Sequence, residues 1–404
     1  MIKRSDLMII GIDVGGTHTD GVLVKKENSQ YKIDSTAKVK TRADNLESSV
    51  LEVLDKLTAE KDNQKINRVV LSTTLVTNII YEDKYEPVGL ILIPGPGVNP
   101  EYLKYGEENI VLDGYIDHRG EEAKSISEPE IKEGLARLQA ENIKNIAVVG
   151  KFSVRNPAQE ERVKEIIEKG DYDFENISLG HQLSGNLNFH RRIITAYYNT
   201  AVSSVHQNFI NSIQASLKER KIEAELYLLK CDGGTAALEN SKETPIETVN
   251  SGPAASIMGA MVLNESSKTG IALDIGGTTT DFGLFINGDP VFKPRGIEIA
   301  SHPTLIRGLY SHSIALGGDS AVRVENGEIK IGPERQGPAA ALGGPLPTPT
   351  DALLVLDQLQ EDRKNQPNFE LKKAEKALAA LKPELDQKLY SAYLKDNDSE
   401  LEIT

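Results

Sequence analysis

The feature that most constrains this chain is a short segment that occurs twice. Residues 9–24 read IIGIDVGGTHTDGVLV, and residues 271–285 read IALDIGGTTTDFGLF. Aligning Asp13 with Asp274 also aligns Gly15 with Gly276, Gly16 with Gly277, Thr17 with Thr278, Thr19 with Thr280 and Asp20 with Asp281. Self-similarity of this kind indicates two copies of one structural unit. The fold must therefore accommodate this unit early and again late in the chain.

Each copy predicts a tight β-hairpin. An apolar strand ends in an aspartate, Gly-Gly-Thr follows, and a Thr-Asp step leads into a second apolar strand. Paired glycines allow φ > 0 and let successive N–H groups converge on an anion, while Thr hydroxyls add donors. We therefore expect two phosphate-binding turns. They comprise Gly15, Gly16, Thr17, His18 and Thr19 in one copy and Gly276, Gly277, Thr278, Thr279 and Thr280 in the other.

The aspartate before each turn has a different expected role. Asp13 and Asp274 cannot bind phosphate directly, but a carboxylate can hold a hydrated Mg²⁺ or orient a water or hydroxyl. The alternative is a plain hairpin, in which Gly-Gly only supplies the turn and the polar side chains bond to nearby backbone. Turn chemistry alone does not require the preceding acid. Two copies that both keep it favour a pair of hairpins gripping one nucleotide.

Composition excludes several classes of protein. The 404 residues suffice for two or more domains with buried cores. The single cysteine, Cys231, excludes an internal disulfide framework and a Cys-rich zinc site, and it suits a reducing cytoplasm. A formal charge of −14 argues against nucleic-acid and anionic-membrane partners. The lack of tryptophan argues against an aromatic surface on which the bases of single-stranded nucleic acids could stack. No run approaches a membrane-spanning length, and glycines and Asp13 interrupt the apolar start, unlike a signal peptide.

The N-terminal part predicts alternating strands and helices. Strands are expected at residues 31–40, 69–72, 88–93 and 146–149. Helices are expected to start at capping boxes formed by Asp44 with Glu47 and by Ser127 with Glu130, and at the Asn156-Pro157 step. This order indicates the α/β class.

Two polar stretches in this part have two interpretations each. Thr73 and Thr74 follow a strand, so they either face a site or start the next helix. The DHRGEE stretch from Asp117 is either a metal site or an exposed turn. The turn is favoured, because no second ligand cluster has metal spacing.

The middle of the chain predicts one long helix joining the two halves. Apolar residues recur every four positions from Phe189 to Leu217. Four polar side chains lie on this segment, and we expect them to be solvated or at the rim of the core. They are His190, Arg191, Arg192 and His206.

Two further glycine turns follow. A strand at residues 225–230 leads into CDGGT, where we expect Asp232, Gly233 and Gly234 to line the nucleotide site. The stretch NSGPAAS predicts a helix that begins at Gly252-Pro253, and its N-terminus could also face the nucleotide. Cys231 has no nearby His, so a buried small residue is favoured over a nucleophile.

The C-terminal part contains a third glycine turn. IALGGDS ends an apolar run, and Gly317 with Gly318 could pack against an adenine or ribose. Residues 332–349 predict a long loop, and residues 351–395 predict helices followed by an acidic tail. We therefore expect an N-terminal domain at 1–185, a second domain with the connecting helix at 186–350, and a helical segment at 351–404.

The two Asp-Gly-Gly-Thr hairpins resemble the phosphate motifs of the sugar kinase, heat-shock ATPase and actin superfamily. Within it, the sequence is similar to the hydantoinase A and 5-oxoprolinase family over most of its length. The similarity lies in IDVGGTHTD, STTLVTN, DHRGE, FSVRNPAQEERVKEI, CDGGT, SGPAAS, DIGGTTTD, the GGDS turn, VENGEIKIGP and PTPTDALLVL. It implies an α/β fold with two ribonuclease-H-like, actin-like ATPase domains around a nucleotide cleft.

The resemblance also implies an activity. Members open a cyclic amide such as a hydantoin, 5-oxoproline or a lactam with ATP, and related members serve in ATP-dependent carboxylases. ATP phosphorylates the ring carbonyl oxygen, and water then attacks the carbon. Asp13 and Asp274 would position Mg²⁺ and the attacking oxygen, and Asp232 would line the cleft. Bacterial relatives usually pair this type of chain with a hydantoinase B-like subunit.

Two segments differ from the family pattern. NFHRR at residues 188–192 replaces an acidic run, and GPAAALGG at residues 337–344 lacks the usual Cys and Tyr. Members also continue to a Gly-Gly-Ala-Gly-Pro-Leu-His-like motif that this chain lacks. A late glycine turn contacts the adenosine in this superfamily. We therefore expect weak nucleotide binding, poor base discrimination and little turnover by this chain alone, with its C-terminal helices exposing apolar surface.

Two other functions fit the same motifs. A small-molecule kinase needs only an acceptor hydroxyl and one carboxylate base, and it would leave a stable phosphorylated product. A nucleotide-switched activator or assembly protein would use hydrolysis to drive domain closure. Activators that pass electrons in this superfamily use subunit cysteines for an iron–sulfur cluster. A single cysteine per chain, Cys231, argues against an electron-passing activator.

Overall fold

The computed structural model describes residues 7–27, 30–42, 44–59, 61–263, 268–356 and 370–381. Contacts between residues divide the chain into two compact units. The first unit holds the chain up to Thr269 together with Phe285–Tyr310, and the second holds Gly270–Leu284 and the residues from Ser311 onward. The expected division at residue 185 falls inside the first unit, and the three-domain scheme stays a prediction.

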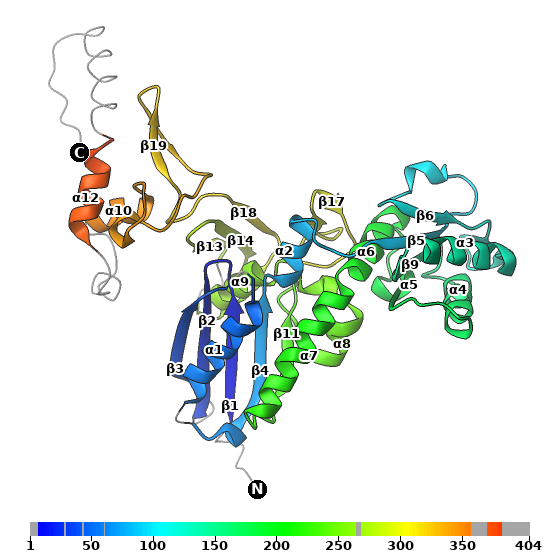
Figure 1. Ribbon diagram of the computed structural model, residues 1–404, viewed down its shortest axis with the longest axis horizontal. Helices are drawn as coiled ribbons and strands as arrows, with labels where there is room; N and C mark the ends of the chain where they lie inside the picture. Colours follow the sequence, from blue (N-terminus) through cyan, green and yellow to red (C-terminus); the bar gives the residue numbers. More distant parts are fainter. Residues whose placement is uncertain are drawn as a thin grey trace. The chain divides into compact units, whose positions relative to one another are not determined.

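A six-stranded sheet forms the first layer of the first unit (Figure 1). Its central strand, β1 (Met8–Val14), pairs antiparallel with β2 (His18–Glu27) and parallel with β4 (Ile66–Thr73). The order across the sheet is β12 (Thr235–Ala237), β11 (Glu225–Leu229), β4, β1, β2 and β3 (Gln30–Lys40). The register sets Asp13 opposite Asp20 on one side and Ser72 on the other.

Helices pack on both faces of this sheet. Ile10, Ile12 and Val14 of β1 are buried in a core with the apolar faces of α1 (Leu46–Thr58) and α7 (Ser203–Glu219). The opposite face contacts α9 (Ser251–Leu263), which lies against β1, β4 and β11. The N-cap of α1 is Asn45, which accepts a hydrogen bond from the Ser48 amide, so the Asp44–Glu47 capping box is wrong by one residue.

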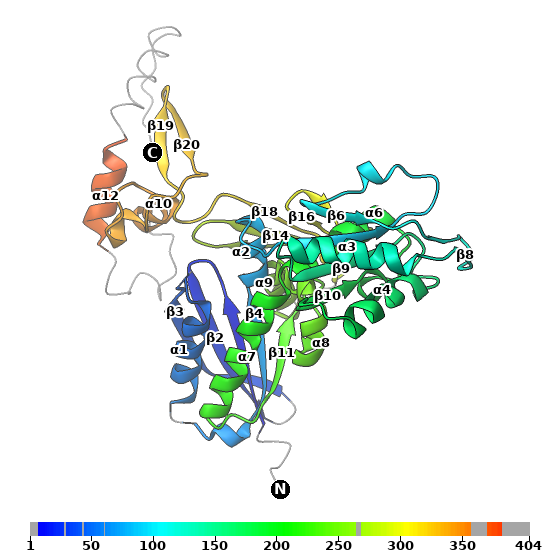
Figure 2. The same ribbon diagram turned by 45° about the vertical axis from the view of Figure 1, so that its right-hand side comes forward.

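A second sheet in this unit is wholly parallel, in the order β10 (Asn176–Leu179), β9 (Asn145–Gly150), β5 (Val88–Ile93) and β6 (Glu108–Val111). β5 and β9 are buried along their whole length, as expected for strands covered on both faces. One face packs on α3 (Glu128–Ala140) and α4 (Ala158–Lys169), which Figure 2 shows beside the sheet. The other face packs on α6 (Phe189–Ala201).

The predicted single helix at 189–217 is wrong. The structure has two helices, α6 and α7, which meet at Val202. Side chains spaced by four residues advance about 40° per step around a helix of 3.6 residues per turn, so the stripe cannot keep facing one partner. The break lets α6 pack on the parallel sheet and α7 on the mixed one.

The expected positions of two side chains on these helices are also wrong. Arg192 of α6 and His206 of α7 are buried, not solvated. The guanidinium of Arg192 donates to the carbonyl oxygens of Gly150, Lys151 and Asn186. A long polar side chain is therefore held inside the core because backbone acceptors lie around it.

The smaller elements connect these layers. The remaining helices of the first unit are α2 (Leu75–Tyr81), α5 (Gly180–Leu183) and α8 (Leu238–Glu243), and its short strands are β7 (Tyr115–Ile116), β8 (Glu122–Lys124), β15 (Asp289–Pro290), β16 (Glu298–Ile299) and β17 (His302–Pro303). Single 3-10 turns occur at Asn63–Lys65, Pro100–Tyr102, Pro245–Thr248 and Ala340–Leu342. The DHRGEE stretch is a turn, as favoured, in which Asp117 accepts from the amides of Arg119 and Glu121.

The second unit is built on the repeated segment. β14 (Thr280–Ile286) lies between β13 (Gly270–Ile275) and β18 (Ser311–Ile314), and its last residues continue into the first unit and pair with β15. A hairpin follows, formed by β19 (Val322–Glu325) and β20 (Glu328–Ile331). The expected C-terminal helices are present as α10 (Pro349–Val355) and α12 (Leu371–Ala379), and the rest of that prediction lies outside the described residues.

No described helix in either unit is both long and apolar enough to cross a membrane.

Candidate functional site

The first hairpin turn is closed by its own backbone and held by one threonine. The Gly15 amide donates to the His18 carbonyl oxygen at 3.0 Å. Thr41, just after β3, donates through its hydroxyl to the Gly15 carbonyl oxygen (2.8 Å) and through its amide to the Thr17 carbonyl oxygen (2.9 Å). Its hydroxyl also lies 2.9 Å from that of Thr19. Sequence reasoning missed Thr41, because only the pairing of β2 with β3 brings it to the turn.

The second hairpin repeats the closing bond. The Gly276 amide donates to the Thr279 carbonyl oxygen at 2.9 Å. None of Gly15, Gly16 and Gly276 has its φ in the left-handed region, so the expected positive φ at these glycines is wrong, while phosphate binding by the turns stays a prediction. A Cβ would lie 3.0 Å from the His18 oxygen at Gly15 and 3.2 Å from the Thr279 oxygen at Gly276. A tight approach of turn backbone accounts for these two glycines, while the Cβ direction of Gly16 meets no atom within 4 Å.

The GGDS turn supports the second hairpin from behind. The amides of Gly318 and Asp319 donate to the carbonyl oxygens of Gly276 (2.9 Å) and Gly277 (2.7 Å). A Cβ at Gly317 would lie 2.6 Å from the Gly277 backbone. Thr350 donates its hydroxyl to the Gly318 carbonyl oxygen at 2.7 Å. The glycines at 317 and 318 thus have a packing role, and the adenosine contact expected there stays a prediction.

A helix N-terminus meets the carboxyl ends of β1 and β4. The Ser251 hydroxyl, in the first turn of α9, accepts from the Thr73 amide (3.2 Å), donates to the Thr73 carbonyl oxygen (3.1 Å) and lies 3.3 Å from the Ser72 hydroxyl. The Cβ direction of Gly252 points toward Oδ1 of Asp13, at 3.9 Å. Asp13, Ser72 and the positive end of the α9 dipole therefore come together.

Thr73 and Thr74 are explained by the start of α2. The Thr73 hydroxyl accepts from the Leu75 amide, and Thr74 is the N-cap residue. Of the two interpretations, the structure supports the helix start for Thr73.

A cavity of about 630 Å³ opens beside Asp13 in the first unit. Its polar lining includes Asp13, Ser72, and Lys38, whose ammonium lies 2.7 Å and 2.8 Å from the carboxylate oxygens of Asp20. Its apolar lining includes Val22, Val70, Leu229, Ala255 and Met258. The cavity therefore combines apolar side chains with a carboxylate, a hydroxyl and an ammonium group.

The CDGGT turn packs on α9. Asp232 accepts from the Gly234 amide at 2.9 Å, and Gly233 has a φ of +80° that favours glycine. Lys230 lies 3.6 Å from the Asp232 carboxylate and 3.3 Å from that of Glu247. Burial alone would lower the pKa of Lys230, but these carboxylates outweigh it and raise the pKa. The turn is therefore held by its own charges.

Cys231 is a buried residue, as favoured. Its thiol contacts the Arg307 carbonyl oxygen at 3.1 Å, and burial raises its pKa well above the usual value. A thiol that stays protonated is a poor nucleophile.

The two hairpins differ in the charge around their second aspartate. Asp20 is paired with Lys38 in the first unit. In the second unit, Asp281 lies opposite Ser313 of β18. Burial raises the pKa of Asp281, the Ser313 hydrogen bond lowers it, and the charge of Asp274 raises it again, with a net increase.

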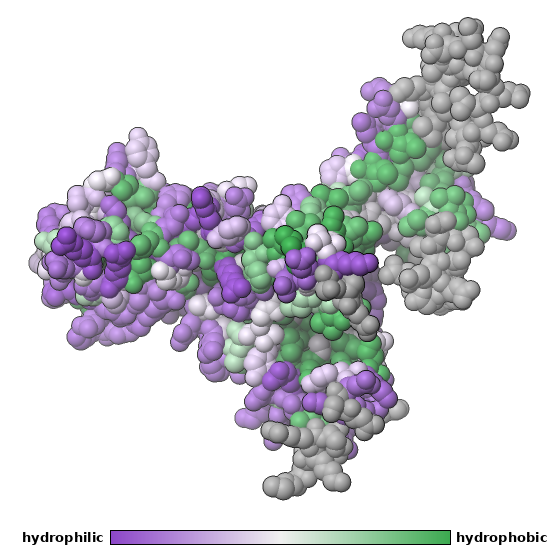
Figure 3. Space-filling view, turned by 180° about the vertical axis from the view of Figure 1, so that it is seen from behind, coloured by the Kyte–Doolittle hydropathy of each residue, from purple (hydrophilic) through white to green (hydrophobic). Residues whose placement is uncertain are grey.

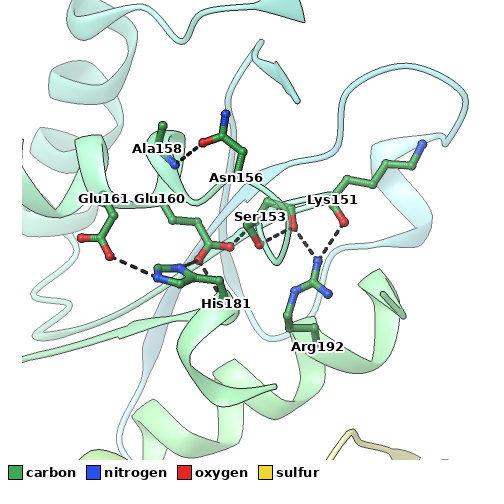
Figure 4. Close-up of polar contacts among 9 residues, drawn as sticks. Lys151, Ser153, Asn156, Ala158, Glu160, Glu161, His181 and Arg192 are labelled. Atoms are coloured by element: carbon green, nitrogen blue, oxygen red, sulfur yellow. Dashed lines mark hydrogen bonds and ion pairs between the residues drawn. The ribbon is translucent and has the colours of Figure 1, made fainter. Parts of the chain in front are cut away.

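A buried polar cluster that sequence reasoning missed lies at the carboxyl end of β9 (Figure 4). The Glu160 carboxylate accepts from the amides of Gly150 (2.7 Å) and His181 (3.0 Å), and it lies 2.6 Å from Nδ1 of His181. Nε2 of His181 lies 3.1 Å from Glu161. Burial lowers the pKa of His181, but the two carboxylates outweigh this and raise it. An acidic pair in the first turn of a helix was the available signal.

The expected site residues lie against several elements in each unit. In the first unit the turn at 15–19 follows Asp13 of β1, the Cβ direction of Gly252 in α9 points toward Asp13, and Gly233 packs on Met258 of α9. In the second unit the turn at 276–280 adjoins Gly317 and Gly318. The grip of both hairpins on one nucleotide stays a prediction.

Comparison with known proteins places these features in a family. The model of the hydantoinase/oxoprolinase N-terminal region matches residues 9–170, and the hydantoinase/oxoprolinase model matches residues 192–393. The chain is 26% identical over 426 residues to the acetophenone carboxylase gamma subunit of Aromatoleum aromaticum, covering 94% of this chain and 57% of that one. It is 24% identical over 384 residues to the caprolactamase subunit alpha of Pseudomonas jessenii, covering 87% and 55%. It is 30% identical over 268 residues to the 5-oxoprolinase of Saccharomyces cerevisiae, covering 63% and 20%.

Two solved structures share the fold. An acetone carboxylase from a study of ATP-dependent acetone carboxylation, in a nucleotide-free state, superposes with a TM-score of 0.71 at 20% identity, covering 94% of this chain and 59% of that one. The ATP-dependent caprolactamase from Pseudomonas jessenii gives 0.69 at 20% identity, covering 92% and 58%. The chain thus spans little more than half of the length of most of these relatives. With residues 9–170 and 192–393 matched, a span that includes both hairpins, the CDGGT turn and the SGPAAS start of α9, this chain belongs to the hydantoinase/oxoprolinase family.

Proposed function

We propose that this chain is the nucleotide-binding part of an ATP-dependent enzyme that opens a cyclic amide, such as a hydantoin, 5-oxoproline or a lactam. The observation that carries the proposal is the meeting of Asp13, Ser72 and the N-terminus of α9 beside a cavity with an apolar lining. A carboxylate next to a helix N-terminus suits a metal–phosphate group on one side and a small neutral ring on the other.

The residues fit Mg-ATP on their chemistry. The open side of Gly16 gives a phosphate access to the hairpin backbone, and the α9 dipole favours the anion. Mg²⁺ usually binds proteins through one or two carboxylates and keeps several waters, a set that Asp13 and Asp274 can supply. In this proposal residues 1–185 and 186–350 form two ribonuclease-H-like domains that bind one nucleotide.

The proposed reaction balances in three steps. The ring carbonyl oxygen attacks the γ-phosphorus of ATP, so that an O–P bond forms and the bond to ADP breaks. Water then adds to the activated carbon, the C–N bond of the ring opens and the nitrogen takes a proton, which leaves an acyl phosphate. A second water attacks the same carbon, the C–O bond to phosphate breaks, and phosphate leaves with the original carbonyl oxygen. Asp13, which adjoins both the hairpin and the cavity, orients the reacting oxygen.

Relatives support the class of substrate and the presence of a partner. Two of them are named as a 5-oxoprolinase and a caprolactamase, and the latter is described as ATP-dependent. Two are named as subunits. We therefore propose a hydantoinase B-like partner subunit and a cytoplasmic location.

Isotope transfer tests the reaction. The chain, alone and with a co-purified partner, is given Mg-ATP and a panel of hydantoin, 5-oxoproline and lactams labelled with ¹⁸O at the carbonyl. We expect a ring-opened product and ¹⁸O in the released phosphate, both lost in Asp13→Asn. A stable phosphorylated substrate would show a kinase, and ATP hydrolysis without substrate turnover would show a nucleotide switch.

A further inference from the structure

Thr41 holds the first hairpin turn, and α1 in turn holds the chain next to Thr41. The hydroxyl of Thr41 donates to the Gly15 carbonyl oxygen, and its amide donates to the Thr17 carbonyl oxygen. The next amide along the chain, that of Arg42, donates to the Ser49 hydroxyl in α1 at 2.9 Å. Ser49 is fully buried, and Thr41 is 9% exposed. The backbone of the turn is therefore tied to the core of the first unit.

The hydroxyl protons of Thr41 and Thr19 are both used inside the protein. A threonine hydroxyl has one proton to donate. Because Thr41 gives its proton to the Gly15 carbonyl oxygen, Thr19 is the donor in the contact of 2.9 Å between the two hydroxyls. The counterpart of Thr19 in the second copy, Thr280, donates to the Leu316 carbonyl oxygen at 2.6 Å. In both copies this threonine therefore has no proton left for a phosphate.

The bond from Thr41 also sets the direction of one amide. In a trans peptide, the C=O group of one residue and the N–H group of the next point in opposite directions. Since the Gly15 carbonyl oxygen points toward Thr41, the Gly16 amide points away from it. Gly16 is exposed, and its Cβ direction meets no atom within 4 Å. The turn therefore presents the Gly16 amide away from the core.

The second copy reaches the same arrangement with different residues. There the Gly276 carbonyl oxygen, the counterpart of that of Gly15, accepts from the Gly318 amide at 2.9 Å. By the same geometry the Gly277 amide points away from Gly318. A side-chain hydroxyl in one copy and a backbone amide in the other thus hold the same carbonyl oxygen. Two unrelated supports for one peptide orientation indicate that the orientation has a use.

Backbone amides are suited to an anion at the first turn. Hydrophobic side chains gather over the face of the six-stranded sheet that lies opposite to α1 and α7 (Figure 3). Lys38, which lines the cavity on this face, is already paired with Asp20. Oriented amides can bind a phosphate without a neighbouring cation.

We propose that Thr41 is a positioning residue for nucleotide binding. Together with Thr19 it fixes the peptide between Gly15 and Gly16, so that the Gly16 amide donates to a phosphate oxygen of Mg-ATP. Thr41 and Thr19 act through the turn and do not contact the nucleotide. The inference rests on the proposed nucleotide site and adds the residues that keep its first turn in a binding orientation.

Binding of tripolyphosphate with Mg²⁺ to the full chain, measured by calorimetry, tests the role of Thr41. Thr41→Val keeps the shape of the side chain and the backbone amide but removes the hydroxyl, whereas Thr41→Ser keeps the hydroxyl. We expect binding about tenfold weaker in Thr41→Val and within about twofold of the unchanged chain in Thr41→Ser. The KM for ATP should rise in Thr41→Val more than kcat for hydrolysis falls.

Thr58→Val is the matched control, because the Thr58 hydroxyl also donates to a backbone carbonyl oxygen, that of Leu54 in α1, at 2.8 Å. It should bind tripolyphosphate as the unchanged chain does. Nuclear magnetic resonance of the chain labelled with ¹⁵N-glycine gives a second readout. Tripolyphosphate should shift the Gly16 amide resonance in the unchanged chain, which needs no variant, and much less in Thr41→Val.

Three results would overturn the proposal. They are equal binding by Thr41→Val and the unchanged chain, an equal loss in Thr58→Val, and a Gly16 resonance that does not move. If the unchanged chain bound no tripolyphosphate at all, the proposed nucleotide site would fail together with this inference. If binding behaved as expected and no ring were opened, only the proposed reaction would fail.

Discussion

His206 makes the stability of the first unit depend on pH. The side chain is 1% exposed on α7, and burial lowers its pKa from 6.5 to about 4, although a contact with the Ser241 backbone works in the opposite direction. The unfolded chain therefore binds a proton at this residue between pH 6.5 and pH 4 that the folded chain does not. Stability is full above pH 6.5 and falls as the pH drops toward 4.

The size of this effect follows from the two pKa values. A pKa of about 4 against 6.5 limits the loss to about 3 kcal/mol once both states are protonated. Between pH 7 and pH 5 the same relation gives a loss of about 2 kcal/mol. That is a large share of the stability of a typical domain.

Urea unfolding at pH 7 and pH 5 measures the change in the free energy of unfolding. We expect His206→Gln to be less stable at pH 7 but to lose about 2 kcal/mol less than the unchanged chain on going to pH 5. His181→Gln is the control with the opposite sign. The raised pKa of His181 adds stability that is full below pH 6.5 and is lost as the pH rises through the folded pKa. Equal pH dependence in the unchanged chain and His206→Gln would refute the reasoning.

Three further predictions concern the two units. Asp13→Asn should lower ATP hydrolysis by about 100-fold or more with an unchanged unfolding transition, measured by phosphate release and circular dichroism; unchanged hydrolysis would contradict the site. Gly317→Ala should destabilise the second unit by about 1–3 kcal/mol, because its Cβ would lie 2.6 Å from the Gly277 backbone, whereas Gly259→Ala meets no atom within 4 Å and should not destabilise. Asp351→Ala should cost about 3 kcal/mol in the same unit, because the buried carboxylate accepts from the amides of Ala340, Ala341 and Thr348. Hydrogen exchange of β18 and α10 checks the last two, and exchange as slow as in the unchanged chain would count against them.

Local patterns predicted the strands and turns well. The strand at 88–93 has the predicted bounds, and helices begin after Ser127 and after Pro157 as predicted. The Ser127–Glu130 capping box is wrong, because the Ser127 side chain makes no capping hydrogen bond and Glu130 accepts from the Asp113 amide. These elements depend on apolar runs and start signals that are local in sequence. The repeated hairpins were recognisable from the residues that the two copies share. In the structure both copies form the closing hydrogen bond of the turn.

Features that depend on distant contacts could not be predicted. Thr41 reaches the first turn only through the pairing of β2 with β3, and the Glu160–His181 cluster forms where α4 meets the end of β9. The sequence allows a ligand contact for Gly317 and Gly318, but their close packing on Gly276 and Gly277 explains the need for glycine equally well. A glycine that allows close approach looks the same in sequence as one that binds phosphate.

The repeated sequence does not give two equivalent sites. In the first copy the Asp20 carboxylate is neutralised by Lys38, so the charge next to Asp13 is balanced. In the second copy the residue opposite Asp281 is Ser313, and the pKa of Asp281 is raised mainly by burial and further by the charge of Asp274. A partly buried carboxylate beside a second carboxylate is stabilised by a divalent cation more than a carboxylate that already pairs with a lysine. In the proposed enzyme, Asp274 of the second hairpin is therefore the stronger of the two Mg²⁺ ligands, and the first hairpin, beside the apolar cavity, is the better place for the reacting ring.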